Sequence, residues 1–240
     1  MNGHRTCIIC LPRTGSQLSE KLIGEISNAY NLGEFFENWN QNSQYELDSN
    51  SNIYIKEFVF TPSPFKLTNN IEERLDLLKK INPDQPLSLR IFLMDHYDKA
   101  QLSNIVTELK NIGFEFVTLM RDVKEQLLSY MIAYTYLTSK NINVFDINSP
   151  INEPVTIDIN KLGRTLTQIR NSNNNWEKNV STILNNTAYQ KINYQTIYSD
   201  MSAIYNREFK YFGNKSIKVD PLDLIVNKKE IMVILDILLK

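Results

Sequence analysis

A short turn near the start of the chain carries side chains that suit the binding of an anion. The stretch Pro12–Ser16 reads Pro-Arg-Thr-Gly-Ser and follows an apolar run. Arg13 offers a fixed positive charge with a planar fork of donors, and the hydroxyls of Thr14 and Ser16 can add further donors. Gly15 lets the backbone approach a ligand closely. This chemistry fits a phosphate or sulfate group, but a plain turn capped by Ser16 would also explain the pattern.

A second arginine and a serine stand farther along the chain, eight positions apart. Arg121 closes the apolar run FEFVTLM, and Ser129 lies about two helical turns into the segment that follows. Asp122 and Glu125 have the spacing of a capping box for that helix. The arginine could meet the serine hydroxyl at a shared anion, or it could pair with the neighbouring carboxylates instead.

The elements that would position these residues alternate between strands and helices, because apolar runs alternate with segments of helical period. The expected strands are Arg5–Leu11, Ile53–Phe58, Leu87–Met94, Phe114–Met120 and Tyr189–Tyr194. The expected helices are Gln17–Tyr30, Ile71–Ile81, Lys99–Ile112, Val123–Ser139, Asp158–Asn185 and Lys228–Leu239. This order predicts one α/β domain over residues 1–240, with a parallel central sheet flanked by helices. Ligands of such sheets bind beyond the carboxyl ends of the strands.

Composition and charge narrow the classes of function. The chain has 240 residues, of which 42% are hydrophobic and 22% charged, and its net charge is −1. A charge near zero argues against a protein that binds nucleic acid by bulk electrostatics. No apolar stretch is long enough to span a bilayer, and the first strand begins too early for a signal peptide, so we expect a cytoplasmic protein. Cys7 and Cys10 should be core residues, because their odd spacing puts them on opposite faces of a strand.

Together, the two motifs resemble those of the sulfotransferases that use 3′-phosphoadenosine 5′-phosphosulfate (PAPS). In that family a P-[KR]-[ST]-G-[ST] loop grips the 5′-phosphosulfate, here Pro12–Ser16 with Gln17 directly after it. An arginine and, eight residues later, a serine hold the 3′-phosphate, here Arg121 and Ser129. Weaker similarities in NNNWEKNVSTIL, INYQTIYSD and FKYFG extend the likeness over residues 5–213. The resemblance implies a P-loop NTPase-like sulfotransferase fold, with PAPS as donor and adenosine 3′,5′-bisphosphate as product.

The likeness is closer to compact bacterial carbohydrate sulfotransferases, and it implies further site residues. Those enzymes carry a Glu-Phe-Phe-like stretch whose glutamate is the base. Here NLGEFFENW supplies Glu34, with Glu37 and His96 as alternatives. They also carry a lysine near the end of a following strand, where Lys56 would contact the transferring sulfuryl group or orient the acceptor. Arg13 would stabilise the leaving phosphate, and no metal is required.

The chain departs from the steroid and phenol enzymes of the family at its C-terminal end. Those enzymes place an Arg-Lys-Gly segment over the 3′-phosphate, whereas FGNKSIKVDP offers Lys215 and Lys218, which could equally be solvated loop residues. The acceptor is expected to be a carbohydrate or small molecule. The long segment Thr138–Val155 would line its site, and aromatic residues such as Trp39 could stack on a sugar there or could equally belong to the core. The oligomeric state is not indicated.

Two other functions fit the same features. One is a P-loop kinase or another nucleotide-binding enzyme, but serine and not lysine follows Gly15, and no magnesium-binding pair is evident. The other is a non-catalytic anion- or glycan-binding relative that keeps the anion motifs and lacks a base. Glu34 separates this second alternative from an enzyme.

Overall fold

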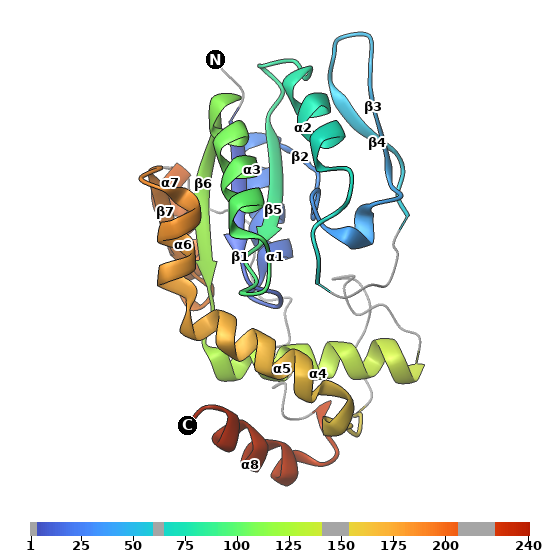
Figure 1. Ribbon diagram of the computed structural model, residues 1–240, viewed down its shortest axis with the longest axis vertical. Helices are drawn as coiled ribbons and strands as arrows, with labels where there is room; N and C mark the ends of the chain where they lie inside the picture. The colour runs from blue at the N-terminus through green and yellow to red at the C-terminus, as the bar shows by residue number, and fades with distance from the viewer. Residues whose placement is uncertain (1–3, 60–64, 141–153, 206–223) are drawn as a thin grey trace.

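The protein is built on a five-stranded parallel sheet with the strand order β2-β5-β1-β6-β7 (Figure 1). The computed structural model describes residues 4–59, 65–140, 154–205 and 224–240. The strands of the sheet are β1 (Arg5–Cys10), β2 (Tyr30–Asn31), β5 (Leu87–Phe92), β6 (Phe114–Met120) and β7 (Tyr189–Asn193). The predicted α/β class, with a parallel central sheet between helices, is confirmed.

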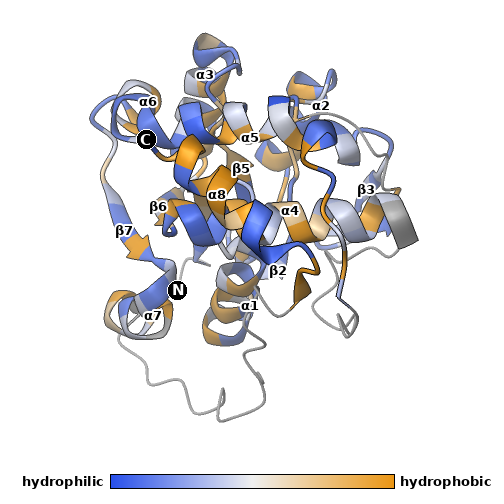
Figure 2. Cartoon of the chain, turned by 90° about the horizontal axis from the view of Figure 1, so that it is seen from below, coloured by the Kyte–Doolittle hydropathy of each residue, from blue (hydrophilic) through white to orange (hydrophobic). Residues whose placement is uncertain are grey.

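Helices cover both faces of this sheet and its lower end. They are α1 (Ser16–Ser27), α2 (Ile71–Lys79), α3 (Lys99–Asn111), α4 (Val123–Lys140), α5 (Ile159–Asn174), α6 (Trp176–Leu184), α7 (Ile197–Tyr205) and α8 (Lys228–Leu238). Seen from below, α1 and α7 lie on one side of the strands and α2, α3 and α6 on the other (Figure 2). Helices α4 and α5 cross beneath the carboxyl ends of the strands, with α8 below them (Figure 1).

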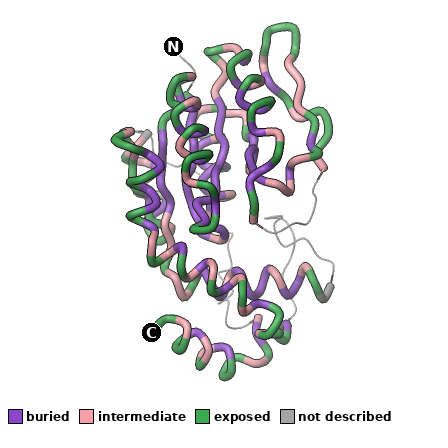
Figure 3. Tube along the Cα trace, viewed as in Figure 1, coloured by how far each residue is buried: buried purple, intermediate pink, exposed green. Residues whose placement is uncertain are grey.

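The central strands are buried from end to end, because both of their faces meet helices (Figure 3). Every residue of β1 and β5 is buried, and in β6 Glu115 alone is exposed. This burial is the reason for the continuous apolar runs in the sequence. Arg5 is a charged exception at the start of β1. Its guanidinium donates to the main-chain carbonyls of Ile112 (3.0 Å) and Asn82 (2.7 Å).

The register of the strands aligns their carboxyl ends. Cys10, the last residue of β1, pairs with Phe92 of β5 and with Leu119 of β6. Leu119 in turn pairs with Ile192 of β7. The segments that follow these residues therefore emerge at one edge of the sheet, where ligands of parallel sheets bind.

Several sequence-based expectations differ from the structure. The strand expected at 53–58 forms as β4 (Ile53–Glu57), but it pairs antiparallel with β3 (Gln44–Leu47) in a separate sheet. Its exposed Tyr54 and Lys56 suit a hairpin with one face toward solvent. The single helix expected over 158–185 is divided into α5 and α6, because Asn175 leaves helical geometry. The sequence did not predict β2, β3 or α7.

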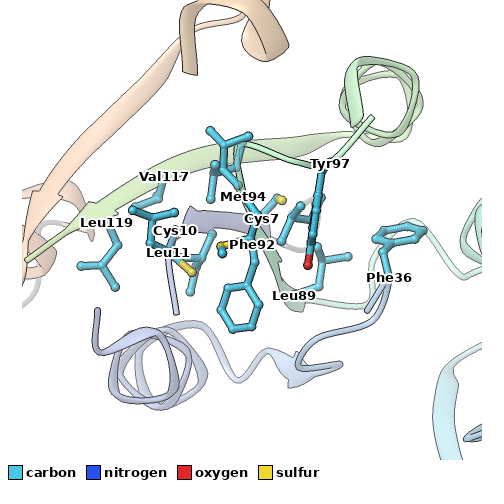
Figure 4. Packing of buried hydrophobic residues seen from close by; sticks show 14 of the residues in the cluster. Cys7, Cys10, Leu11, Phe36, Leu89, Phe92, Met94, Tyr97, Val117 and Leu119 are labelled. Atoms are coloured by element: carbon cyan, nitrogen blue, oxygen red, sulfur yellow. The ribbon is translucent and has the colours of Figure 1, made fainter. Parts of the chain in front are cut away.

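The two cysteines provide a test of the core. Cys7 and Cys10 are free and fully buried among apolar side chains (Figure 4). Burial raises the pKa of the Cys10 thiol to about 12 and that of Cys7 well above its usual value. We expect neither thiol to react with a maleimide in the native protein at about pH 8, since the thiolate is the reactive form. Both should react in guanidinium chloride, and mass spectrometry counts the labels. Rapid labelling of either cysteine in the native protein would contradict their burial in the core.

Candidate functional site

The segments that follow β1 and β6 meet at the carboxyl edge of the sheet. Arg13 Nε donates a hydrogen bond to Ser129 Oγ of α4 over 3.2 Å. Arg121 Nη1 donates to the main-chain carbonyl of Arg13 over 3.3 Å, and Gln126 Nε2 donates to that of Pro12 over 2.6 Å. The two anion motifs of the sequence therefore form one cluster. We call Pro12–Ser16, Arg121 and Ser129 the anion cradle.

The turn between β1 and α1 has the backbone pattern of an anion-binding nest. Arg13 and Gly15 have φ of 65° and 93°, whereas Thr14 between them does not have a positive φ. Such alternation aims successive N–H groups toward one side. Gly15 is the N-cap of α1, no side chain caps this helix, and its first turn has no acidic residue. The positive end of the helix dipole thus faces the cradle without a side chain to offset it.

The hydroxyls of the turn mainly shape the turn itself. Thr14 is buried, and its Oγ1 donates to the carbonyl of Leu11 over 2.7 Å. Ser16 is also buried, and both hydroxyls act to lower the pKa of the nearby Cys10 thiol. Neither is the side-chain cap that a plain turn would use. Gln17, the second residue of α1, is half-buried.

Tyr194 closes over the turn from the end of β7, a role that sequence reasoning missed. A Cβ atom on Gly15 would lie 2.3 Å from Tyr194 Cδ2, so the ring packs directly on the glycine. The guanidinium of Arg121 lies 4.3 Å from the centre of the same ring, a cation–π contact. The one signal in the sequence was Tyr194 itself, the first tyrosine of INYQTIYSD. Gly15 is therefore required for the approach of a side chain as well as for its positive φ.

Positive charge is concentrated in the cradle. Burial lowers the pKa of Arg13 to about 10, and the charge of Arg121 acts in the same direction. Tyr194 and Glu34 oppose this shift. Arg13 still carries its charge at neutral pH, so two guanidinium groups that repel each other are held together. An anion bound between them would relieve this repulsion.

The start of α4 fixes Arg121 from the other side. The N–H of Glu125 donates to Asp122 Oδ1 over 3.0 Å, which confirms that Asp122 caps the helix. The carboxylate of Glu125 does not complete a capping box, because it lies 3.2 Å from Arg121 Nε. This is the pairing with a neighbouring carboxylate that the sequence left open, and it exists together with the contact between the two motifs.

Glu34 lies beside the cradle and is held by a buried arginine. Its Oε1 is 3.0 Å from Arg90 Nη2 of β5, and Arg90 Nη1 is 2.7 Å from Glu20 Oε2 of α1. The side chains of Glu20 and Arg90 are 1% and 8% exposed, and that of Glu34 is 19% exposed. Its negative charge opposes the lowering of the Arg13 pKa, as a carboxylate near the turn would. Glu34 therefore presents a partly exposed carboxylate next to the cradle.

A second buried arginine holds the segment that carries Glu34. Arg74 of α2 donates to the main-chain carbonyls of Phe35 and Asn40. The side chain of Asn40 donates to the carbonyl of Glu34 over 2.9 Å. The aromatic ring of Phe35 also lies under the Arg74 guanidinium. These contacts leave the main chain around Glu34 little freedom.

The other candidate base residues are less suitably placed. Glu37 is fully buried and accepts hydrogen bonds from the Tyr97 hydroxyl (2.7 Å) and the N–H of Phe92 (3.3 Å). Burial raises the pKa of Glu37 well above its usual value. His96 is exposed, and its Nε2 donates to the carbonyl of Phe65 over 2.8 Å. Glu34 is thus the candidate that the geometry favours.

Three lysines complete the residues named from the sequence. Lys56 lies on the exposed β3–β4 hairpin, where its Nζ is 2.5 Å from Glu46 Oε1. No contact among the described residues brings it to the cradle. Lys215 and Lys218 lie outside the described residues. Most of the expected acceptor loop, residues 141–153, does so as well.

The aromatic side chains that could stack on an acceptor pack largely on other aromatic rings. Trp39 is half-buried and meets Phe65 edge to face with ring centres 5.0 Å apart. Tyr130 and Tyr134 of α4 stack with centres 6.2 Å apart, and Tyr130 also lies near Phe65. Core packing accounts for most of their surface.

Comparison with known proteins adds no family. No protein-family model matches the sequence, and no curated protein matches it. Among the described residues, no group of three or more histidine, cysteine, aspartate or glutamate side chains is arranged to hold a metal ion. The same part of the chain has no helix that is long and apolar enough to cross a membrane.

The contact between Gly15 and Tyr194 can be tested with a matched control. Gly15 and Gly113 both have positive φ, 93° and 88°, but only Gly15 has another residue within 4 Å of an added Cβ. Gly113→Ala should cost about 1–2 kcal/mol of unfolding free energy from backbone strain. Gly15→Ala should cost a further 1–3 kcal/mol or so, because the Tyr194 ring must move.

Denaturant unfolding measures both losses. Adding Tyr194→Ala to Gly15→Ala should make the two substitutions less than additive, because the clash is then absent. Equal losses for Gly15→Ala and Gly113→Ala would mean that Tyr194 does not lie on the turn.

Proposed function

We propose that this protein transfers a sulfuryl group from PAPS to a hydroxyl group of a carbohydrate or another small acceptor. The observation that carries the proposal is the hydrogen bond between Arg13 and Ser129. It joins, at one edge of a parallel sheet, the two short motifs on which the resemblance to sulfotransferases depends. A helix that begins directly after the first strand also suits the binding of a phosphate group.

The turn would hold the 5′ end of the donor. Aspartate caps α3, where the carboxylate of Asp98 accepts from the N–H groups of Ala100 and Gln101, whereas α2, α6 and α8 begin without a side-chain cap, as α1 does. The start of α1 has no such cap, so an anionic ligand could take that place. Arg13 and the N–H groups of the turn would then lie where negative charge grows on the 5′-phosphate, and they would stabilise the transition state.

Arg121 and Ser129 would hold the 3′-phosphate. The side chain of Arg121 is 12% exposed, and its contacts with Tyr194 and Glu125 fix its direction. Ser129 accepts a hydrogen bond from Arg13 and can still donate its own O–H. A donor fixed at both phosphates has a defined register, which aligns its sulfur with an acceptor.

Glu34 would act as the general base. In the transfer, the acceptor oxygen forms a bond to sulfur while the bond from sulfur to the 5′-phosphate oxygen breaks. The proton of the acceptor hydroxyl passes to Glu34, and adenosine 3′,5′-bisphosphate leaves. As in phosphoryl transfer, the protein mainly positions groups and stabilises charge. The ion pair with Arg90 supports this role, because it fixes the carboxylate beside the cradle.

Binding of the product tests the donor site. Adenosine 3′,5′-bisphosphate should raise the melting temperature without magnesium, because it would bind the native protein alone. At a ligand concentration of one hundred times Kd, the free energy of unfolding should rise by about 2.7 kcal/mol. ATP with magnesium should give a markedly smaller shift. A larger shift with ATP and magnesium would favour the kinase alternative.

The same titration identifies the 3′-phosphate site. Arg121→Ala and Ser129→Ala should each reduce the binding free energy of the bisphosphate by about 1.5–3 kcal/mol, which is the scale of a hydrogen bond to a charged group. The binding free energy of adenosine 5′-phosphate should fall much less. This difference separates the loss of a 3′-phosphate contact from general damage to the turn. Arg164→Ala, on the exposed face of α5, is the control. Equal losses of binding free energy for both nucleotides would mean that Arg121 and Ser129 do not bind the 3′-phosphate.

Turnover tests the base. A screen of sugars, glycolipids and phenols with labelled PAPS first finds an acceptor. Glu34→Gln should then lower transfer by about 10²-fold or more while the bisphosphate still binds, because the amide cannot take the proton. Glu25→Gln, an exposed residue of α1, should transfer normally. Near-native turnover of Glu34→Gln would reject Glu34 as the base. Binding of the bisphosphate with no acceptor sulfated would favour the non-catalytic alternative.

A further inference from the structure

One buried guanidinium serves two carboxylates beneath the anion cradle. Arg90 of β5 pairs with Glu20 of α1 on one side and with Glu34 on the other. The three residues come from three separate segments of the chain, so the tertiary structure fixes both pairs. The single positive charge of Arg90 cannot neutralise two ionised carboxylates, and Glu20 is almost without solvent to share the excess charge.

The two pairs are not equivalent. The contact between Arg90 and Glu34 is a hydrogen bond as well as an ion pair. The contact with Glu20 is a charge contact only, because Arg90 Nη1 and Nε are buried without a hydrogen-bond partner among the described residues. Glu20 Oε1 is buried without a partner in the same way. Glu20 is therefore the carboxylate that is less well stabilised as an anion.

We propose that Glu20 sets the proton affinity of Glu34 through the shared Arg90. If Glu34 is the base, as proposed above, Glu20 is then a positioning residue that acts through Glu34 without touching the substrate. When Glu20 is ionised, the charge of Arg90 is divided, and Glu34 takes a proton more readily. When Glu20 carries a proton, Arg90 is left to Glu34 alone, and Glu34 is a weaker base.

The surroundings of Glu20 let its charge change near neutral pH. Burial raises the pKa of Glu20 to about 7, and the negative charge of Glu34 acts in the same direction. Arg90 and the polar groups of Asn31 and Gly33 oppose this shift. Glu20 is therefore protonated below about pH 6 and ionised above about pH 8.

The other titratable groups that face Glu20 belong to β1. Cys7 and Cys10 both feel the charge of Glu20, but burial raises the pKa of each thiol far above neutrality. Both therefore stay uncharged over the range in which Glu20 titrates. Glu37 also feels the charges of Glu34 and Arg90, and burial raises its pKa well above the usual value, so a titration near neutral pH is assigned to Glu20 only where Glu20→Gln removes its signal.

Coupling between two carboxyl groups is reciprocal, so it can be measured from either side. Glutamate labelled with ¹³C at the side-chain carboxyl gives one NMR signal for each residue, and the single variants assign Glu20 and Glu34. We expect Glu34→Gln to move the titration of Glu20 to lower pH, and Glu20→Gln to do the same for Glu34. Glu25→Gln, on the exposed face of α1, should leave both unchanged.

An unchanged titration of Glu20 in Glu34→Gln would overturn the proposal. This variant alters the more exposed carboxyl group, so it keeps the test decisive where Glu20→Gln fails to fold. The measurement needs neither donor nor acceptor. It therefore gives its answer whether the proposed function holds or fails.

Turnover tests the consequence for catalysis. The ratio of native to Glu20→Gln turnover should be near one below about pH 6, where the native Glu20 is protonated as well. It should rise to roughly threefold to tenfold above about pH 8, because a weaker base takes the proton less readily. Binding of the bisphosphate should not change. A ratio that is constant with pH would overturn the role in catalysis while the proposed function stands. If no acceptor is sulfated, the proposed function fails, and the NMR titration alone decides the coupling.

Discussion

The parallel register of β1 with β5 and β6 is the constraint on which the site depends. Because Cys10, Phe92 and Leu119 lie in one row, the chain leaves all three strands at the same edge of the sheet. The turn after β1 and the start of α4 can then meet, and β7 brings Tyr194 to the same edge. A shift of one residue would exchange the side chains that pack on the two helix layers and would also misplace the site, so the core enforces the register.

Three charged side chains are buried beneath this edge of the sheet, and their burial costs desolvation free energy. Burying Arg90, Glu20 and Arg74 removes them from water, and a buried ion pair seldom repays its desolvation in full. What the pairs provide is position: Arg90 and Arg74 hold Glu34 and its main chain from two directions. If Glu34 is the base, as proposed, it needs such support on its loop, because a small displacement from the reacting atom lowers the rate strongly.

The sequence indicated those features that depend on local pattern. Periodicity predicted most helices and strands, since a buried parallel strand is a continuous apolar run. Arg121 stands at the end of a predicted strand and Ser129 about two helical turns farther on, so local pattern was enough to single out this pair. In contrast, β4 pairs with β3 in a sheet of its own, and pairing between strands is not a local property. Arg90 was hidden inside the run LRIFLM, because its partners are Glu20 of α1 and Glu34, and nothing in the neighbouring sequence indicates either pair.

The contacts that build the anion cradle also tie it to the whole fold. They join residues 108, 114 and 116 positions apart, and none can form until β1 and β6 are paired. The repulsion between Arg13 and Arg121 opposes this assembly, so the core of the sheet must stabilise it. The unfolded chain lacks the cradle altogether. An anion that binds there would therefore bind the native state alone, and the full free energy of binding would appear as stability of the fold.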